Sequence, residues 1–215
     1  MSIWKWKNNK YEKVQWFGKP RTEKAVIYGS AMSLLDADKE PENAVKFVQN
    51  MAYKTVMPDI WVGMDLPEVF GKELLDTPFP KVLRCNYANE KCNGIPAKEY
   101  PETYFMDVVP GLKAELMFRL PPSLGTIFYF NWNTMQVALH LILWMGFKHI
   151  VFSGIDLQGI NYADGRKLTK AKQEEIPRLL NQEFEWMKTF VESANKYGVK
   201  LENTSKTSRL KELMS

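Results

Sequence analysis

Polar residues that could do chemistry follow several short apolar segments of the chain. Gly29 and Ser30 come directly after the apolar segment 25–28, and Asn50 follows the segment 45–49. Their amide, hydroxyl and backbone N–H groups can bind an anion or a ligand rich in hydroxyls, and a carboxylate can also accept a proton. The residues selected on this pattern are Gly29, Ser30, Ser33, Asn50, Asp65, Asn133, Thr134 and Asp156.

The first of these turns is Gly29-Ser-Ala-Met-Ser33. It lacks both the G-x-G-x-x-G pattern of dinucleotide-binding loops and the G-K-[ST] ending of a Walker A loop. A single glycine between a strand and a helix still lets backbone amides approach an anion at the helix N-terminus, and Ser33 adds a hydroxyl. The alternative is that Gly29 serves turn geometry alone.

Two further positions each have more than one interpretation. Asn133 and Thr134 precede an apolar helix, where they can cap the helix N-terminus, bind a phosphate or carboxylate there, or do both. Asp156 can bind a ligand hydroxyl, hold a metal or cap the next turn. The histidines suggest no nucleophile–base pair, because His140 lies in the apolar helix and His149 has the pattern of a surface residue.

Short apolar strands alternate with helices, which indicates an α/β fold with a mostly parallel sheet flanked by helices. Ligands bind such sheets beyond the carboxyl ends of the strands, where the selected polar residues would gather. A helix is expected after residue 30. The other expected elements are strands at 25–29, 45–50, 59–65, 81–86, 126–130, 148–156 and 199–203, and helices at 135–145 and 170–197, the latter interrupted near Pro177.

The chain is expected to consist of an arm at 1–24 and one domain at 25–215, with an irregular insertion at about 87–125. The arm holds seven Lys or Arg residues against two Glu residues, together with Trp4, Trp6, Tyr11 and Trp16. These aromatic rings could stack on nucleic-acid bases while the lysines meet phosphates. The alternative, which we favour, is an edge strand that packs its aromatic side chains on the core.

Composition excludes several classes of protein. With 215 residues, 45% hydrophobic and 25% charged, the chain is neither a disordered tail nor a coiled coil. Two cysteines and two histidines predict no disulfide framework and no tightly bound transition metal, which favours the cytoplasm. Prolines and asparagines interrupt the uncharged stretch 120–147, so no membrane span is expected.

Three segments carry a resemblance to a known family. The segments 26–34, 46–50 and 133–156 resemble the bacterial sialyltransferases of glycosyltransferase family 42. They equally resemble a related family that includes flagellin-modification proteins and a hydroxymethylpterin diphosphokinase. Residues 145–156 are the most specific part, and the opening turn at Gly29 is degenerate. The resemblance implies a Rossmann-like sheet that binds a nucleotide sugar.

The resemblance also implies roles for individual residues. Ser30, Asn50 and Asn133 or Thr134 would contact the nucleotide, and Tyr162 would hold the donor phosphate. The family uses a histidine beyond that loop as general base, and this chain has none after His149. A carboxylate would then take the proton, and the candidates are Asp156, Glu174 and Glu175.

The expected function is a metal-independent glycosyltransferase without a cofactor, in which a nucleotide sugar donates to a hydroxyl of a glycan or of a hydroxymethylated base in DNA. The part that binds the acceptor would come from residues 66–125 or, if the protein is a homo-oligomer, from a partner subunit. Two alternatives stay open. One is a diphosphokinase-like enzyme that uses ATP and Mg²⁺ with Asp65 and Asp156 as ligands. The other is a non-catalytic protein that binds nucleotides or nucleic acid.

Overall fold

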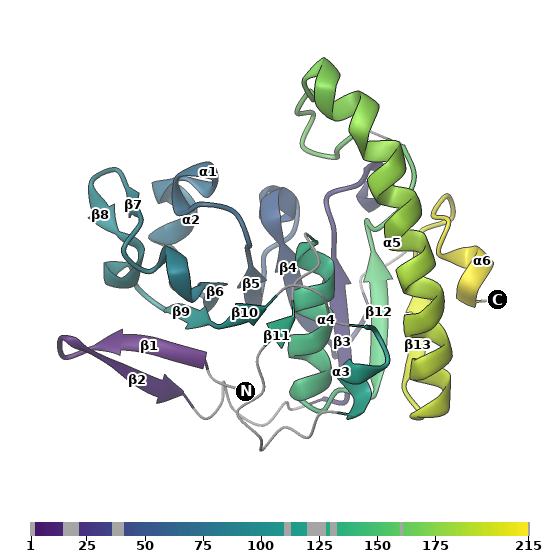
Figure 1. Ribbon diagram of the computed structural model, residues 1–215, viewed down its shortest axis with the longest axis horizontal. Coiled ribbons are helices and arrows are strands. Elements are labelled where there is room, and N and C mark those ends of the chain that lie inside the picture. The colour runs from purple at the N-terminus through teal and green to yellow at the C-terminus, as the bar shows by residue number, and fades with distance from the viewer. Residues whose placement is uncertain are drawn as a thin grey trace.

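The structure is a computed structural model that describes residues 3–14, 22–35, 41–109, 113–119, 128–129, 133–159 and 161–214. One large sheet organises these residues, with helices on both of its faces (Figure 1). The chain is therefore a mixed α/β protein, as the alternation of strands and helices predicts.

The sheet has nine strands, of which seven pair in parallel, while β1 and β2 at one edge form an antiparallel hairpin whose inner strand pairs antiparallel with β9. This confirms the predicted mostly parallel sheet. In spatial order the strands are β13 (Lys200–Asn203), β12 (His149–Ser153), β3 (Lys24–Tyr28), β4 (Val45–Gln49), β5 (Ile60–Val62), β6 (Lys81–Arg84), β9 (Thr103–Met106), β1 (Ile3–Lys7) and β2 (Lys10–Val14).

The apolar sequences of the central strands explain their position. In β3, Ile27 lies between Phe47 of β4 and Phe152 of β12, and all three side chains are buried. The next residue back, Val26, faces the other side of the sheet and joins a second core. Strands buried on both faces are typical of parallel sheets, and each fully buried side chain of this size contributes roughly 1.5–3 kcal/mol.

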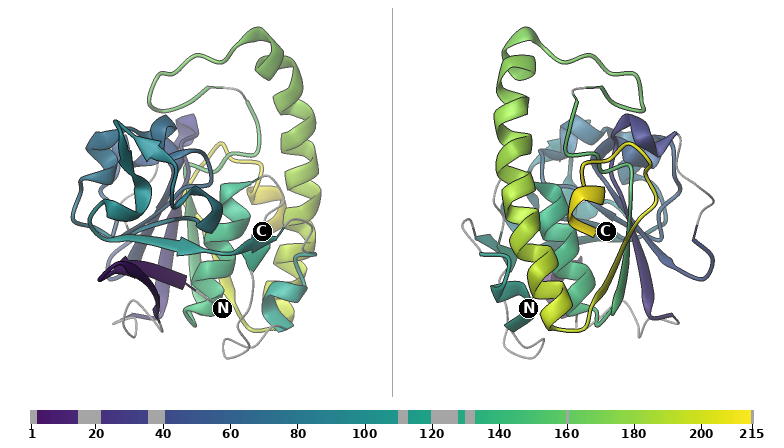
Figure 2. Two further views of the ribbon diagram at one scale, coloured as in Figure 1. Left: turned by 60° about the vertical axis from the view of Figure 1, so that its left-hand side comes forward. Right: turned by 90° about the vertical axis from the view of Figure 1, so that its right-hand side faces the viewer.

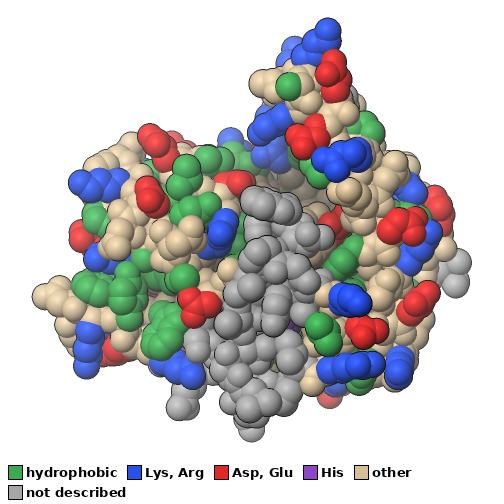
Figure 3. All heavy atoms as spheres, in the orientation of Figure 1, with side chains coloured by type: hydrophobic (Ala, Val, Ile, Leu, Met, Phe, Trp, Pro, Cys, Tyr) green, Lys and Arg blue, Asp and Glu red, His purple; other side chains and the backbone are tan. Residues whose placement is uncertain are grey.

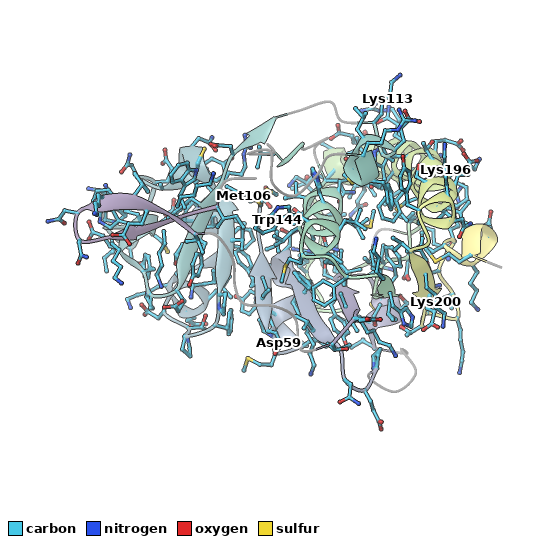
Figure 4. All side chains as sticks on the ribbon, turned by 90° about the horizontal axis from the view of Figure 1, so that it is seen from below. Asp59, Met106, Lys113, Trp144, Lys196 and Lys200 are labelled. Carbon is cyan, nitrogen blue, oxygen red and sulfur yellow. The ribbon has the colours of Figure 1, made fainter. Side chains whose placement is uncertain are left out.

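Two long helices, α4 (Thr134–Trp144) and α5 (Lys170–Lys196), cover one face of the sheet, where α3 (Leu116–Arg119) and α6 (Lys211–Met214) join them (Figure 2). Their side chains fill the space above the strands (Figure 4). Among the described residues no helix is long and apolar enough to cross a membrane. The other face carries α1 (Pro67–Phe70), α2 (Lys72–Leu75) and short 3₁₀ turns at Asn50–Lys54, Cys85–Tyr87 and Ala97–Glu99.

Two helix predictions differ from the structure. The expected helix after residue 30 is a single 3₁₀ turn, Met32–Leu34. The expected interruption near Pro177 is absent, and α5 continues through the proline. Pro177 lacks an N–H group, so the helix loses one backbone hydrogen bond there. The residues of α5 before Leu180 are mostly exposed, and this half of the helix projects beyond the sheet, past the carboxyl ends of β3 and β12 (Figures 1 and 2).

The segment at 87–125 is more regular than predicted, because it contributes β9 to the interior of the main sheet. It also forms the hairpin β7 (Lys91–Cys92) and β8 (Ile95–Pro96). After β9, β10 (Val108–Val109) pairs with β11 (Phe128–Tyr129) in a separate parallel pair, so the strand expected at 126–130 lies outside the main sheet. These strands have two to four residues each, too few to show an alternating pattern in the sequence.

The described part of the arm forms the hairpin β1–β2 at the edge of the main sheet, which is the edge-strand alternative. Trp4 packs against the second core, and the rings of Trp6 and Tyr11 meet edge to face at 4.8 Å. Trp16 lies outside the described residues.

Candidate functional site

The site begins where β3 and β12 end side by side. The N–H of Gly29 donates to the carbonyl of Ser153 at 2.9 Å, and the N–H of Ala31 donates to the carbonyl of Gly154 at 3.0 Å. A Cβ atom on either glycine would lie 2.4 Å from the carbonyl oxygen of the other. Glycine is therefore required at both positions by this close approach of the two backbones, a reason more specific than turn geometry.

A cavity of about 210 Å³ opens beyond these strand ends, and we call it the strand-end cleft. Two of its non-glycine lining residues, Asn50 and Leu157, have φ values of 48° and 52°. Left-handed residues other than glycine are uncommon and concentrate at functional sites. The cleft brings together six of the predicted residues, Gly29, Ser30, Asn50, Asn133, Asp156 and Tyr162, and adds Gln49, Gln158 and Asn161.

The side chains of Asn50 and Thr134 are fixed to each other at this cleft. The hydroxyl of Thr134 donates to Oδ1 of Asn50 at 3.1 Å, and Nε1 of Trp61 donates to the backbone carbonyl of Asn50 at 2.8 Å. The amide NH₂ of Asn50 is thereby oriented as a donor for an incoming oxygen atom. Asparagine is one of the few residues that tolerates the left-handed conformation found here.

Asn133 caps α4, because its Oδ1 accepts a hydrogen bond from the N–H of Met135 at 2.8 Å. Capping is one of the two roles that the sequence predicts for this position. Asn133 also lines the strand-end cleft, so the positive end of the α4 dipole lies at the cleft. An anion placed there would be stabilised.

The carboxylate of Asp156 is occupied by hydrogen bonds within the protein. Ser33 donates to it from its hydroxyl and from its backbone N–H, the latter at 3.3 Å, and the hydroxyl of Ser205 donates at 3.3 Å. Asp156 is 7% exposed and Ser33 is 2% exposed. These contacts tie the end of β12 to the turn after β3 and to the segment after β13, so both residues support the cleft.

A second cavity, of about 460 Å³, adjoins the first and is called here the cation-lined cleft. Asn50, Tyr162 and Ile176 line both cavities, so the two lie side by side. Arg166, Lys167 and Lys172 contribute positive charge, and Asp65 and Glu175 contribute carboxylates.

Arg166 is held at the junction of the two clefts. Its guanidinium donates to the hydroxyl of Ser30 at 2.9 Å and lies 3.8 Å from the centre of the Tyr162 ring. The N–H of Ala163 donates to the carbonyl of Ser30 at 2.9 Å, which docks this loop onto the turn after β3. Arg166, Lys167 and Lys172 are not among the residues predicted from the sequence, although residues 166–172 hold four cations within seven positions.

The three carboxylates predicted as bases are separated in the structure. Glu175 lines the cation-lined cleft together with Asp65. Glu174 lines a different hollow on α5, together with Pro177 and Arg178, because adjacent residues of a helix point about 100° apart. Asp156 lies in the strand-end cleft with its carboxylate engaged by serines.

The two carboxylates that the diphosphokinase alternative requires, Asp65 and Asp156, line different clefts. In the described part of the chain no group of three or more His, Cys, Asp or Glu side chains could hold a metal ion. Asp36 and Asp38 form a further carboxylate pair in the sequence, outside the described residues. Metal independence stays a prediction.

The solved structures that resemble this chain include two of the sialyltransferase CstII. One, from Campylobacter jejuni in complex with the substrate analogue CMP-3FNeuAc, has a TM-score of 0.53 and 18% identity, and the match covers 90% of this chain and 86% of that chain. Another, in complex with a trisaccharide acceptor and CMP, has a TM-score of 0.52 and 15% identity over 89% and 85% of the two chains. No family model and no curated protein matches the sequence. The chain therefore has the fold of a sialyltransferase.

Proposed function

We propose that this protein is a metal-independent glycosyltransferase that takes a sugar from a nucleotide sugar and transfers it to a hydroxyl of a glycan. The observation that carries the proposal is the pair of neighbouring clefts at the carboxyl edge of the sheet, which share Asn50 and Tyr162 as lining residues. One cleft offers amides, hydroxyls and a helix N-terminus, and the other offers cations and carboxylates. The shared fold supports this assignment, since the CstII structures hold CMP, a CMP-sugar analogue and a trisaccharide acceptor.

In the proposed reaction the acceptor oxygen attacks the anomeric carbon of the donor sugar. A new C–O bond forms as the bond between that carbon and the phosphate oxygen breaks, and the nucleotide leaves with the bonding electrons. Arg166 and the N-terminus of α4 lie where they can stabilise the negative charge of the departing phosphate. Lys172 adds a third positive group on the wall of the second cleft.

We assign the role of general base, which takes the proton of the acceptor hydroxyl, to Glu175. Of the three carboxylates predicted as bases, it is the one that lines the cation-lined cleft, and its side chain is exposed to solvent there. Its neighbour Glu174 provides a matched control, because it has the same chemistry on the same helix but lines a separate hollow.

The test is turnover of a panel of nucleotide sugars, beginning with CMP-activated sugars, in the presence of a chelator. We expect release of nucleotide by the wild-type protein, a loss of about 10²–10⁴-fold in rate in Glu175→Gln, and a near-normal rate in Glu174→Gln. Donor binding by Glu175→Gln should persist, which separates the proton transfer from binding.

Two outcomes would contradict the proposal. One is the absence of turnover with every donor, which would favour a non-catalytic binding protein. The other is turnover that requires ATP and Mg²⁺, which would favour the diphosphokinase-like alternative.

A further inference from the structure

A third cavity, of about 410 Å³, lies away from both clefts, and we call it the aromatic pocket. Two of its residues directly follow parallel strands, Cys85 after β6 and Asp107 after β9. The pocket therefore lies at the carboxyl edge of the same sheet, three strands along from β4, which corresponds to roughly 15 Å at the usual spacing of strands. Its lining residues are Trp4, Tyr11, Cys85, Asn89, Phe105 and Asp107.

The aromatic walls of the pocket are held by the ladder of the sheet. Trp4 pairs with Phe105 across β1 and β9, and Tyr11 is the cross-strand partner of Trp6 in the β1–β2 hairpin. The ring of Tyr11 meets that of Phe105 edge to face at 6.5 Å, and it is 42% exposed. Hydrophobic side chains gather over this hairpin on the surface of the molecule (Figure 3). Rigid rings of this kind provide a preformed platform for a ligand.

The polar side chains of the pocket are an amide and a carboxylate. Asp107 accepts a hydrogen bond from the thiol of Cys85 at 2.8 Å, and Asn89 supplies both donors and acceptors. Burial, together with the nearby Asp107, raises the pKa of Cys85 to about 11, so the thiol stays protonated. Among the described residues that line the pocket there is one carboxylate and no cation, which disfavours a phosphate or another anion.

We propose that the aromatic pocket is an accessory binding site for a neutral sugar unit. A pyranose ring presents apolar C–H faces that suit aromatic rings, and hydroxyls around its rim that suit an amide and a carboxylate. The position of the pocket at the same sheet edge lets it hold a distal unit of the glycan whose other end enters the cation-lined cleft. This link to the acceptor rests on the proposed function, whereas binding of the sugar itself does not.

The test is titration of the protein with a panel of neutral trisaccharides. Binding is measured by calorimetry and by tryptophan fluorescence. We expect binding that quenches or shifts this fluorescence, and affinities about tenfold weaker in Tyr11→Ala and in Asp107→Asn. Tyr197→Ala is the matched control, since Tyr197 is 37% exposed and stacks on Phe118 in the helical layer. Trisaccharide affinity should be unchanged in that variant.

Trisaccharide binding that is as strong in Tyr11→Ala and Asp107→Asn as in the wild type would overturn the proposal. A preference for acidic oligosaccharides or for single-stranded DNA over neutral sugars would also overturn it. Donor binding is measured on the same variants and should match that of the wild type. Loss of the proposed transferase activity alone would leave sugar binding in this pocket intact, so the two failures are distinguishable.

Discussion

Gly29 and Gly154 set the shape of the strand-end cleft because neither residue has a Cβ atom. The two backbones approach each other closely after both strands, and a Cβ atom on Gly154 would lie 2.4 Å from a backbone oxygen and 2.8 Å from the Cβ of Leu34. Gly159 has a similar φ of 74° on the same loop, yet a Cβ there would meet nothing within 4 Å. The two positions therefore separate the cost of backbone conformation from the cost of crowding.

We predict that Gly159→Ala loses roughly 1–2 kcal/mol of unfolding free energy, because a left-handed conformation is strained for alanine. Gly154→Ala should lose a further 1–3 kcal/mol or so, because the two strand ends must also move apart. Urea denaturation of both variants measures this difference. Equal losses would show that the backbones do not approach each other as closely as described.

Arg166 is the residue that we expect to meet the donor phosphate. We predict that Arg166→Gln weakens donor affinity by about tenfold or more, because a charge-assisted hydrogen bond is lost. Binding by the variant should also depend less on salt concentration. Arg119→Gln is the control, since Arg119 lies on α3 with an exposed side chain. Equal donor affinities for the wild type and Arg166→Gln would remove Arg166 from the site.

At the scale of elements, the contact between α4 and α5 contains a buried carboxyl group. Glu183 is 5% exposed, and Nε2 of Gln136 donates to its Oε2 at 2.9 Å. Burial raises the pKa of Glu183 from 4.5 to about 7. His140, also on α4, has its pKa lowered by burial from 6.5 to about 4.

These two groups affect stability with opposite signs. As pH rises from about 4.5 to 7, the unfolded chain releases the Glu183 proton before the folded chain does, so stability falls, by roughly 3 kcal/mol in total. His140 acts the other way, since stability rises as pH increases from about 4 to 6.5.

We predict that Glu183→Gln removes the first effect and keeps the second. The unfolding free energy of the variant should rise between pH 4.5 and 6.5 and then level off, and it should exceed that of the wild type at pH 8. Chemical denaturation at a series of pH values provides the measurement. A variant that is less stable than the wild type at pH 8 would contradict this assignment.

Elements with a strong local pattern were predictable from the sequence, and elements fixed by distant contacts were not. Strands β3, β4 and β12 and helix α4 lie within a few residues of their predicted bounds, because most of the residues in each are apolar. Strand β9 was missed because its four residues become a strand only by pairing with β6 and β1.

The same distinction holds for the site. Asn50 and Asn133 could be selected because they follow or begin a predictable element. Arg166 could not, because its place depends on a loop that docks onto Ser30, far away in the sequence. The sequence also could not distinguish Glu174 from Glu175, because the orientation of α5 decides which of the two lines the cation-lined cleft.

At the scale of the whole molecule, one sheet edge collects every feature that we assign to ligand binding. The strand-end cleft lies beyond β3, β4 and β12, the cation-lined cleft continues toward Asp65 after β5, and the aromatic pocket follows β6 and β9. The amino ends of the strands, marked by Asp59 and Lys200 in Figure 4, form the opposite edge. A donor and an extended acceptor could therefore lie along one edge of the protein.

The most direct test of this arrangement is titration of the purified wild-type protein with nucleotide sugars, CMP-activated sugars first, by calorimetry. We predict saturable binding of one donor per chain and a raised melting temperature, since a ligand at 100 times its dissociation constant stabilises the native state by about 2.7 kcal/mol. If no nucleotide sugar binds and none raises the melting temperature, the clefts at the carboxyl edge are not a donor site and the proposed function is wrong.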